Sequence, residues 1–218
     1  MKSFLKVIIP VGIILFLLLL QVMPSHSPQE QIGGLPWQIE TLADGSSRAL
    51  GIHLGEDNLK DAVRLLGRPE GLALFSPQTE ARDLSLEAYF GTVRNGPLAA
   101  KLILVLTASQ EQMRAMAERA ITRKPGPSGA YQWTLSEADK QQVLAYRIRA
   151  LTYIPLYAKL EPEFFSSRFG QPSARQTLDK QRERWLYPEQ GLSIDINPEG
   201  QEVLHYVAPR DFVHPGPG

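Results

Sequence analysis

The sequence has 218 residues, 43% of them hydrophobic, with 23 basic and 23 acidic side chains. This length allows one domain or two small ones with a real core, and the absence of a basic run argues against nucleic acid as a partner. Cysteine is absent, which excludes disulfides, thiolate catalysis, zinc–sulfur and iron–sulfur sites, and lipid attachment through a cysteine.

The first 23 residues have the pattern of a membrane segment. Lys2 and Lys6 precede residues 7–23, which apart from Gln21 are apolar, glycine or proline. As a helix this run rises about 25 Å, enough for one span of a bilayer that thins slightly. Positive charges before the span place the N-terminus in the cytoplasm. The pattern therefore predicts a single-pass protein of the bacterial inner membrane, anchored through residues 7–23, with the remainder in the periplasm.

The same pattern also fits the apolar region of a cleaved signal peptide. Cleavage requires small residues at two positions before the cut, and the best pair, Ser25 and Ser27, is followed by Pro28. Because signal peptidase tolerates proline poorly at that place, we interpret residues 1–23 as a retained signal-anchor helix.

A polar stretch rich in Ser, Pro, Gln and Gly at residues 24–34 predicts a flexible tether. Two strands are then expected at 37–42 and 48–54. The next helix begins after Asp57 or Asn58 as the capping residue, with apolar side chains at helical spacing through Leu66. Gly67 in a left-handed conformation, followed by Pro69, ends this helix.

The middle of the chain alternates between strands and helices. Strands are predicted at 72–75, 84–93 and 98–107, the last two joined by a hairpin at Asn95-Gly96. Helices are predicted at 109–123 and 136–149, with a Pro/Gly-rich loop at 124–129 between them.

The last third begins with a strand at 151–157 and a short helix at 162–169, which Gly170 and Pro172 end. Three strands follow, at 182–187, 192–197 and 202–207, in the pattern of a meander. The tail, residues 214–218, reads His-Pro-Gly-Pro-Gly and cannot join a core.

The order strand, helix, G-x-P, meander thus occurs twice, with Gly67-Arg68-Pro69 matched by Gly170-Gln171-Pro172. The predicted fold class is α+β, with two repeats of a helix followed by an antiparallel meander and an N-terminal transmembrane helix. The expected organisation comprises an anchor, a tether, a first repeat with its following helix, a second repeat and a disordered tail, at residues 1–23, 24–34, 35–130, 131–213 and 214–218.

This pattern resembles the small lipoproteins of the outer-membrane β-barrel assembly machinery, the BamE or SmpA/OmlA type, and beyond them the β-lactamase-inhibitor-protein fold. In that family a stretch like residues 50–69 leads from a strand through a helix to the sheet, and a strand with Trp or Tyr follows. The resemblance covers 50 to 60 residues in each half, and its motifs are short. It implies a non-catalytic scaffold that binds protein, although the lipid-attachment cysteine of the family is missing.

The final hairpin carries the candidate binding residues. A three-residue loop at Pro198-Glu199-Gly200, with Gly200 in a left-handed bulge, would pair Asn197 with Gln201, Ile194 with Leu204 and Leu192 with Tyr206. The other face of the hairpin then carries the candidate partner-binding residues Ser193, Asp195, Val203 and His205. If that face is exposed, charge reversal at Asp195 should change stability by less than about 1 kcal/mol.

Ser193, Asp195 and His205 are also the one grouping that resembles a hydrolase triad. Ser193 lies in a plain strand, with no G-x-S-x-G turn and no helix after it, so we predict no catalytic residue there. No phosphate-binding glycine loop occurs, and no two histidines have metal-ligand spacing, so the sequence predicts neither cofactor nor metal.

Aromatic side chains in the predicted strands have two possible roles, as core residues or as anchors for a partner. We interpret them as core residues, and they are Trp37, Trp133, Trp185, Tyr153, Tyr187 and Tyr206. Lys140, Arg147 and Arg149 form a basic cluster, which we interpret as a solvated helix face and not as a site for lipid headgroups.

Together these observations predict a periplasmic protein-interaction module, tethered to the inner membrane, that acts in envelope assembly or maintenance by binding an envelope protein. An enzyme of unrecognised type acting on cell-wall or lipid substrates, or an inhibitor of a periplasmic enzyme, is the alternative.

Overall fold

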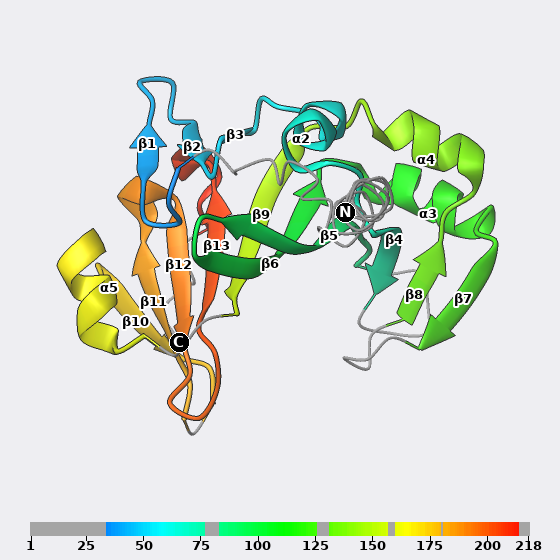
Figure 1. The fold of residues 1–218 in the computed structure, drawn as a ribbon. Helices are drawn as coiled ribbons and strands as arrows, with labels where there is room; N and C mark the ends of the chain where they lie inside the picture. The colour runs from blue at the N-terminus through cyan, green and yellow to red at the C-terminus, as the bar shows by residue number, and fades with distance from the viewer. Residues whose placement is uncertain (1–33, 77–82, 126–130, 157–159, 180, 214–218) are drawn as a thin grey trace, which may run out of the picture.

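The computed structural model describes residues 34–76, 83–125, 131–156, 160–179 and 181–213. They form a ten-stranded antiparallel sheet, a three-stranded antiparallel sheet and four short α-helices (Figure 1). The small sheet contains β1 (Ile39–Thr41), β2 (Ser47–Ala49) and β3 (Ile52–Leu54). In spatial order, the strands of the large sheet are β10 (Ala174–Thr177), β11 (Glu183–Tyr187), β12 (Leu192–Ile196), β13 (Val203–Val207), β9 (Ile148–Pro155), β6 (Leu98–Leu106), β5 (Ser85–Asn95), β4 (Gly71–Ser76), β8 (Tyr131–Thr134) and β7 (Thr122–Pro125). The helices are α2 (Leu59–Leu66), α3 (Gln110–Glu118), α4 (Glu137–Val143) and α5 (Pro162–Phe169).

The fold is therefore mostly β, and the predicted α+β class is wrong. The helix expected at 109–123 ends at Glu118, and the one expected at 136–149 ends at Val143. In both places the chain turns back into the large sheet, as β7 and as β9. Three strands that the sequence did not predict, β7, β8 and β10, complete the two ends of that sheet. Backbone pairing with a neighbouring strand has outweighed helical periodicity in these segments.

The structure also corrects the transmembrane prediction. Across the residues that the structure describes, no helix is long and apolar enough to cross a membrane. The predicted span at 7–23, the tether at 24–34 apart from Gly34, and the tail at 214–218 lie outside the described residues. Within the described residues, no helix supports the predicted signal anchor or inner-membrane localisation.

The predicted strand at 48–54 is divided into β2 and β3 by a tight turn. Ala49 pairs with Ile52, and the two residues between them, Leu50 and Gly51, have φ values of 54° and 80°. Two successive positive φ values give the turn a twist that matches antiparallel strands. Leu50 is buried in this conformation, so its side chain joins the core from within the turn.

The predicted helix ends at Gly67 and Gly170 are confirmed. The amide of Gly67 donates to the carbonyl of Val63, and that of Gly170 donates to the carbonyl of Ser166, both at 3.0 Å. The two glycines have φ values of 80° and 81°, each with ψ of −169°. This is not the predicted left-handed helical conformation but an extended one with positive φ, which is essentially confined to glycine.

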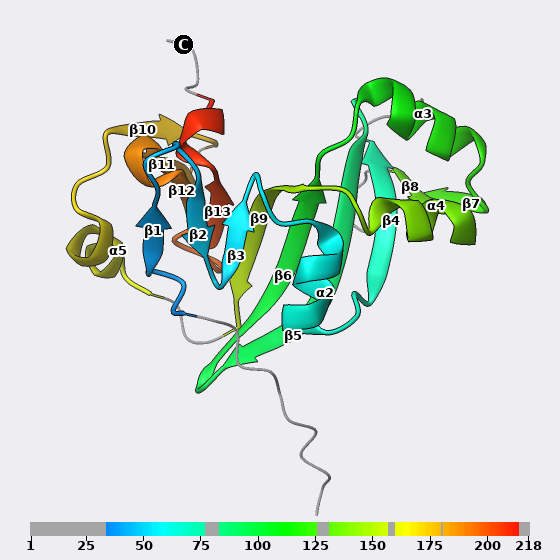
Figure 2. The same ribbon diagram turned by 90° about the horizontal axis from the view of Figure 1, so that it is seen from above.

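Antiparallel strands follow each of these glycines. After α2 the chain forms β4, β5 and β6, and after α5 it forms β10, β11, β12 and β13. The two sets meet at β9, which pairs with β6 on one side and with β13 on the other. As a result β9 lies near the middle of one continuous sheet (Figure 2).

One face of the large sheet forms the core. Among its side chains, five that are at most 3% exposed are Leu86, Leu104, Leu151, Leu204 and Ile194. The small sheet and α2 lie on this side (Figures 1 and 2). Two hydrogen bonds join β9 to the chain after β3: the amide of Gly55 donates to Ile148, and that of Ile148 donates to Asp57. Each fully buried leucine contributes about 1.5–3 kcal/mol to stability.

The register predicted for the last hairpin is confirmed, because Leu192 pairs with Tyr206 and Ile194 with Leu204. The predicted bulge is wrong. Gly200 is not among the described glycines with positive φ, and the strands end at Ile196 and Val203. The Asn197 side chain shapes the turn instead, since its Oδ1 accepts a hydrogen bond from the amide of Glu199 at 3.1 Å.

Candidate binding surface

The second face of the large sheet carries the four predicted binding residues. Ser193 lies directly opposite His205, and Asp195 lies opposite Val203. Their side chains are all half-buried and alternate with buried neighbours along β12 and β13. We call the side of the sheet that presents these four residues the open face, because all four side chains keep partial exposure.

Asp195 is the centre of a polar cluster on this face. Arg184, its direct neighbour on β11, donates from Nε and Nη2 to the two carboxylate oxygens at 2.5 and 2.7 Å. His205 Nε2 lies 3.3 Å from Oδ2 of the same carboxylate, and His205 Nδ1 lies 3.2 Å from Thr152 Oγ1. Four strands, β11, β12, β13 and β9, therefore contribute to one fixed hydrogen-bonded row.

The electrostatics of this cluster favour the ionised carboxylate. Burial alone would raise the pKa of Asp195, but the hydrogen bonds and charges of Arg184 and His205 outweigh that effect and hold the pKa well below its usual range. The Asp195 side chain is 15% exposed. Charge reversal there is consequently not the mild surface change that the sequence suggested, because it would leave the half-buried Arg184 beside a like charge.

The same contacts bear on the hydrolase-like grouping. Both ring nitrogens of His205 are engaged, by Asp195 and by Thr152, and no hydrogen bond joins His205 to the hydroxyl of Ser193. A serine nucleophile requires a base within hydrogen-bond reach. The arrangement of Ser193, Asp195 and His205 is therefore a sheet cluster and not a nucleophile–base pair.

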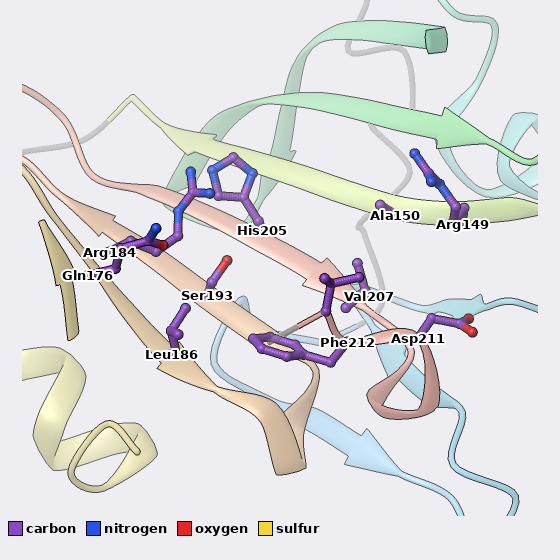
Figure 3. Close-up of a pocket in the computed structure, with 11 residues that line it drawn as sticks. Arg149, Ala150, Gln176, Arg184, Leu186, Ser193, His205, Val207, Asp211 and Phe212 are labelled. Atoms are coloured by element: carbon purple, nitrogen blue, oxygen red, sulfur yellow. The ribbon is translucent and has the colours of Figure 1, made fainter. Parts of the chain in front are cut away.

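A groove of about 410 Å³ crosses the open face next to this cluster (Figure 3). It spans β11, β12, β13 and β9, and we call it the sheet groove. Its polar lining includes Arg149, Arg184, Ser193 and His205, and its apolar lining includes Val207 and Phe212. Of the predicted residues, Ser193 and His205 line the groove directly, while Asp195 acts through its contacts with Arg184 and His205.

Arg149 reaches this groove because of an irregularity in β9. Val105 of β6 pairs with Ala150, but the next residue, Leu106, pairs with Ile148, so β9 has one extra residue at this point. Such a bulge redirects a side chain. Ile148 is buried in the core, whereas Arg149 is exposed at the rim of the groove.

The wall formed by Phe212 is held in place by an ion-pair network. Arg210, two residues earlier, donates to Asp44 at 3.3 Å and to Glu56 at 2.8 Å, and its backbone amide donates to the carbonyl of Gly45. These contacts fix the C-terminal turn against the small sheet. Phe212 is thereby placed over the end of β13.

Several sequence interpretations of side-chain roles can be compared with the structure. Five of the six aromatic residues are 1–5% exposed, which confirms their core role, while Trp37 is half-buried. The predicted basic cluster is divided: Lys140 pairs with Glu137 on α4, and Arg147 pairs with Glu56.

Arg184 and Phe212 also line the groove, and no sequence pattern had indicated either of them. The alternation of β11 could have placed Arg184 on the open face, but nothing local marks the bulge at Arg149.

Glu87, on β5, is a further titratable group of the open face. It pairs with Val105 and with Ala73, both small or apolar. Burial raises the pKa of Glu87 above its usual range, against the effect of a hydrogen bond from Ser85. Because the folded state favours the protonated form, ionisation of Glu87 lowers stability as the pH rises above the ordinary glutamate pKa.

Glu87→Gln is therefore expected to stabilise the protein at pH 7. The gain should shrink as the pH falls toward 4, where the wild-type carboxyl is protonated in both states. Urea unfolding followed by circular dichroism at several pH values measures it. Glu189→Gln, at an exposed position, is the control and should change stability by less than about 0.5 kcal/mol at any pH. Equal effects of the two substitutions at pH 7 would contradict the expectation.

Comparison with known proteins adds no family assignment, because no family model, curated protein or solved structure matches this chain. Among the described residues, no group of three or more His, Asp or Glu side chains is arranged to hold a metal ion.

Proposed function

We propose that this protein is a non-catalytic interaction module that binds a protein partner through the open face of its large sheet. The observation that carries the proposal is the sheet groove, in which apolar side chains such as Val207 and Phe212 adjoin the fixed Arg184–Asp195–His205 cluster. An apolar strip beside oriented polar groups is the composition expected of a recognition site.

The chemistry of the cluster supports binding over catalysis. Asp195 is held ionised by Arg184, and His205 is held between Asp195 and Thr152, so these groups satisfy one another. A catalytic base would need to be aimed at a nucleophile or at a substrate proton. The resemblance to the barrel-assembly lipoproteins implies the same class of function, and it makes envelope assembly the process to examine first.

A bulky substitution in the groove tests the proposal. Ala150 lines the groove opposite Val207, and its side chain is half-buried, so Ala150→Trp should fill the groove while a large residue remains acceptable in a strand. The full chain is cross-linked in its native cells and purified. The amount of partner protein recovered with the Ala150→Trp variant should be about tenfold lower than with the wild type, as expected when the centre of an interface is blocked.

Lys60→Trp supplies the matched control, because it adds the same indole to the exposed side of α2, away from the open face. This variant should keep the partner at the wild-type level, and both variants should unfold cooperatively. Retention of every cross-linked protein by a folded Ala150→Trp variant would overturn the proposal.

A further inference from the structure

Arg149 is an exposed cation placed at the rim of the sheet groove by the bulge in β9. Its guanidinium forms no ion pair or hydrogen bond with another described residue. Its neighbour in sequence, Arg147, instead pairs with Glu56 at 3.4 Å. A cation without a carboxylate, beside an apolar strip, is complementary to an anionic group of a ligand.

Arg184 supplies hydrogen-bond donors at the other end of the groove. Asp195 uses the Nε and Nη2 positions, so the Nη1 hydrogens of the guanidinium remain for a ligand. Gln176 lies directly opposite Arg184 on β10 and also lines the groove. Because Asp195 already fixes the guanidinium plane, a ligand would not have to order this side chain.

The separation of the two arginines sets the length of the ligand. Arg184 is on β11 and Arg149 is on β9, and β12 and β13 lie between them. Three strand spacings correspond to about 14 Å across the sheet. The pairing register places Ile154 of β9 level with Arg184, and Arg149 lies five residues further along β9, or about 17 Å. The two backbone positions are therefore about 22 Å apart, which an extended peptide covers with about seven residues.

We infer that the sheet groove binds an extended acidic segment of the partner protein, about seven residues long. One carboxylate of the segment pairs with Arg149, a second accepts hydrogen bonds from Arg184, and an apolar residue between them packs against Phe212 and Val207. This inference rests on the proposed function and specifies the chemistry of the partner.

Asp211 is the group in the groove that opposes this charge. It lies in the wall next to Phe212, and its charge acts on Arg210, which offsets part of it. Removing this carboxylate should therefore strengthen the binding of an acidic ligand. A purely apolar or a basic ligand would show no such gain.

The test uses the full chain and a fluorescein-labelled, capped heptapeptide with glutamate at both ends and valine in the middle. Binding is followed by fluorescence anisotropy at low salt. We expect the wild type to bind this peptide at least about tenfold more tightly than the version with glutamine at both ends. Arg149→Glu should weaken binding by about tenfold or more, and Asp211→Asn should strengthen it.

Lys60→Glu is the matched control, since it makes the same change of charge on α2 and should leave the affinity unaltered. Equal affinity for the glutamate and glutamine peptides, or an unchanged affinity in Arg149→Glu, would overturn the inference. Displacement of the peptide by a single-stranded oligonucleotide at equal concentration would also overturn it, since the groove would then select only negative charge. In each of these cases the proposed function still stands if Ala150→Trp removes the cross-linked partner.

Discussion

Gly191→Ala is expected to destabilise the protein by more than about 3 kcal/mol. Gly191 joins β11 to β12 with φ of 63° and ψ of 30°, and a Cβ atom there would lie 2.0 Å from the carbonyl oxygen of Val207. That carbonyl belongs to the backbone of β13, so it cannot rotate away like a side chain. The backbone of Val207 is further tied to this turn, because its amide donates to the carbonyl of Gly191 at 2.8 Å.

The control for this prediction is Gly96→Ala in the hairpin between β5 and β6. Gly96 has a similar φ of 58°, but a Cβ atom there would meet nothing within 4 Å. The free energy of unfolding of this variant should fall by about 1–2 kcal/mol, because alanine must adopt the left-handed conformation there without any further clash. Urea unfolding of both variants separates the two contributions. If the two variants lost equal unfolding free energy, the clash with the carbonyl of Val207 would not contribute to the destabilisation.

Asp195→Lys is expected to cost about 3 kcal/mol, the lower end of the range for breaking a buried ion pair. The lower end applies because the Arg184 side chain is 34% exposed and water can partly solvate it. The new lysine would face Arg184 and His205 together, so three groups that can carry positive charge would share one site. The free energy of unfolding in urea at pH 7 measures the loss. Exchanging the charges, with Arg184→Glu added to Asp195→Lys, should recover most of it.

The pH dependence of this pair follows from the low pKa of Asp195 in the folded state. Its stabilisation is fully present above the unfolded aspartate pKa of about 3.9, and it is lost as the pH falls below that value toward the folded-state pKa. The stability difference between wild type and Asp195→Asn should therefore be larger at pH 5 than at pH 3, because it shrinks below about pH 4. A difference that does not change with pH would show that Asp195 contributes through packing alone.

Local signals in the sequence determined both ends of α2 and the register of the last hairpin. Asn58, one of the two predicted caps, begins the helix and Gly67 ends it, and both act within one or two turns of chain. The β12–β13 register follows from alternation, since only one register buries Leu192, Ile194 and Tyr206 together. These features need only near neighbours in the chain, so the residues themselves are sufficient to predict them.

Strand order and fold class depend on distant neighbours. β7, β8 and β10 are four residues each, and β7 and β10 are fully exposed, so they carry no apolar alternation for a sequence pattern to detect. They are strands because β8 and β11 offer hydrogen bonds to the edge strands. The α+β prediction failed for this reason, because it was based on the apolar periodicity within each segment. Strand formation in these segments depends instead on the neighbouring strand that pairs with them.

The candidate site divides in the same way. The sequence by itself determined that Ser193, Asp195, Val203 and His205 share one face, because alternation in a paired hairpin is local. Only the tertiary structure decided that a bulge in β9 brings Arg149 to the same groove as Arg184. β9 lies there because it pairs with β13 and with β6, and this order is set by pairing across the whole sheet, which no short stretch of sequence contains.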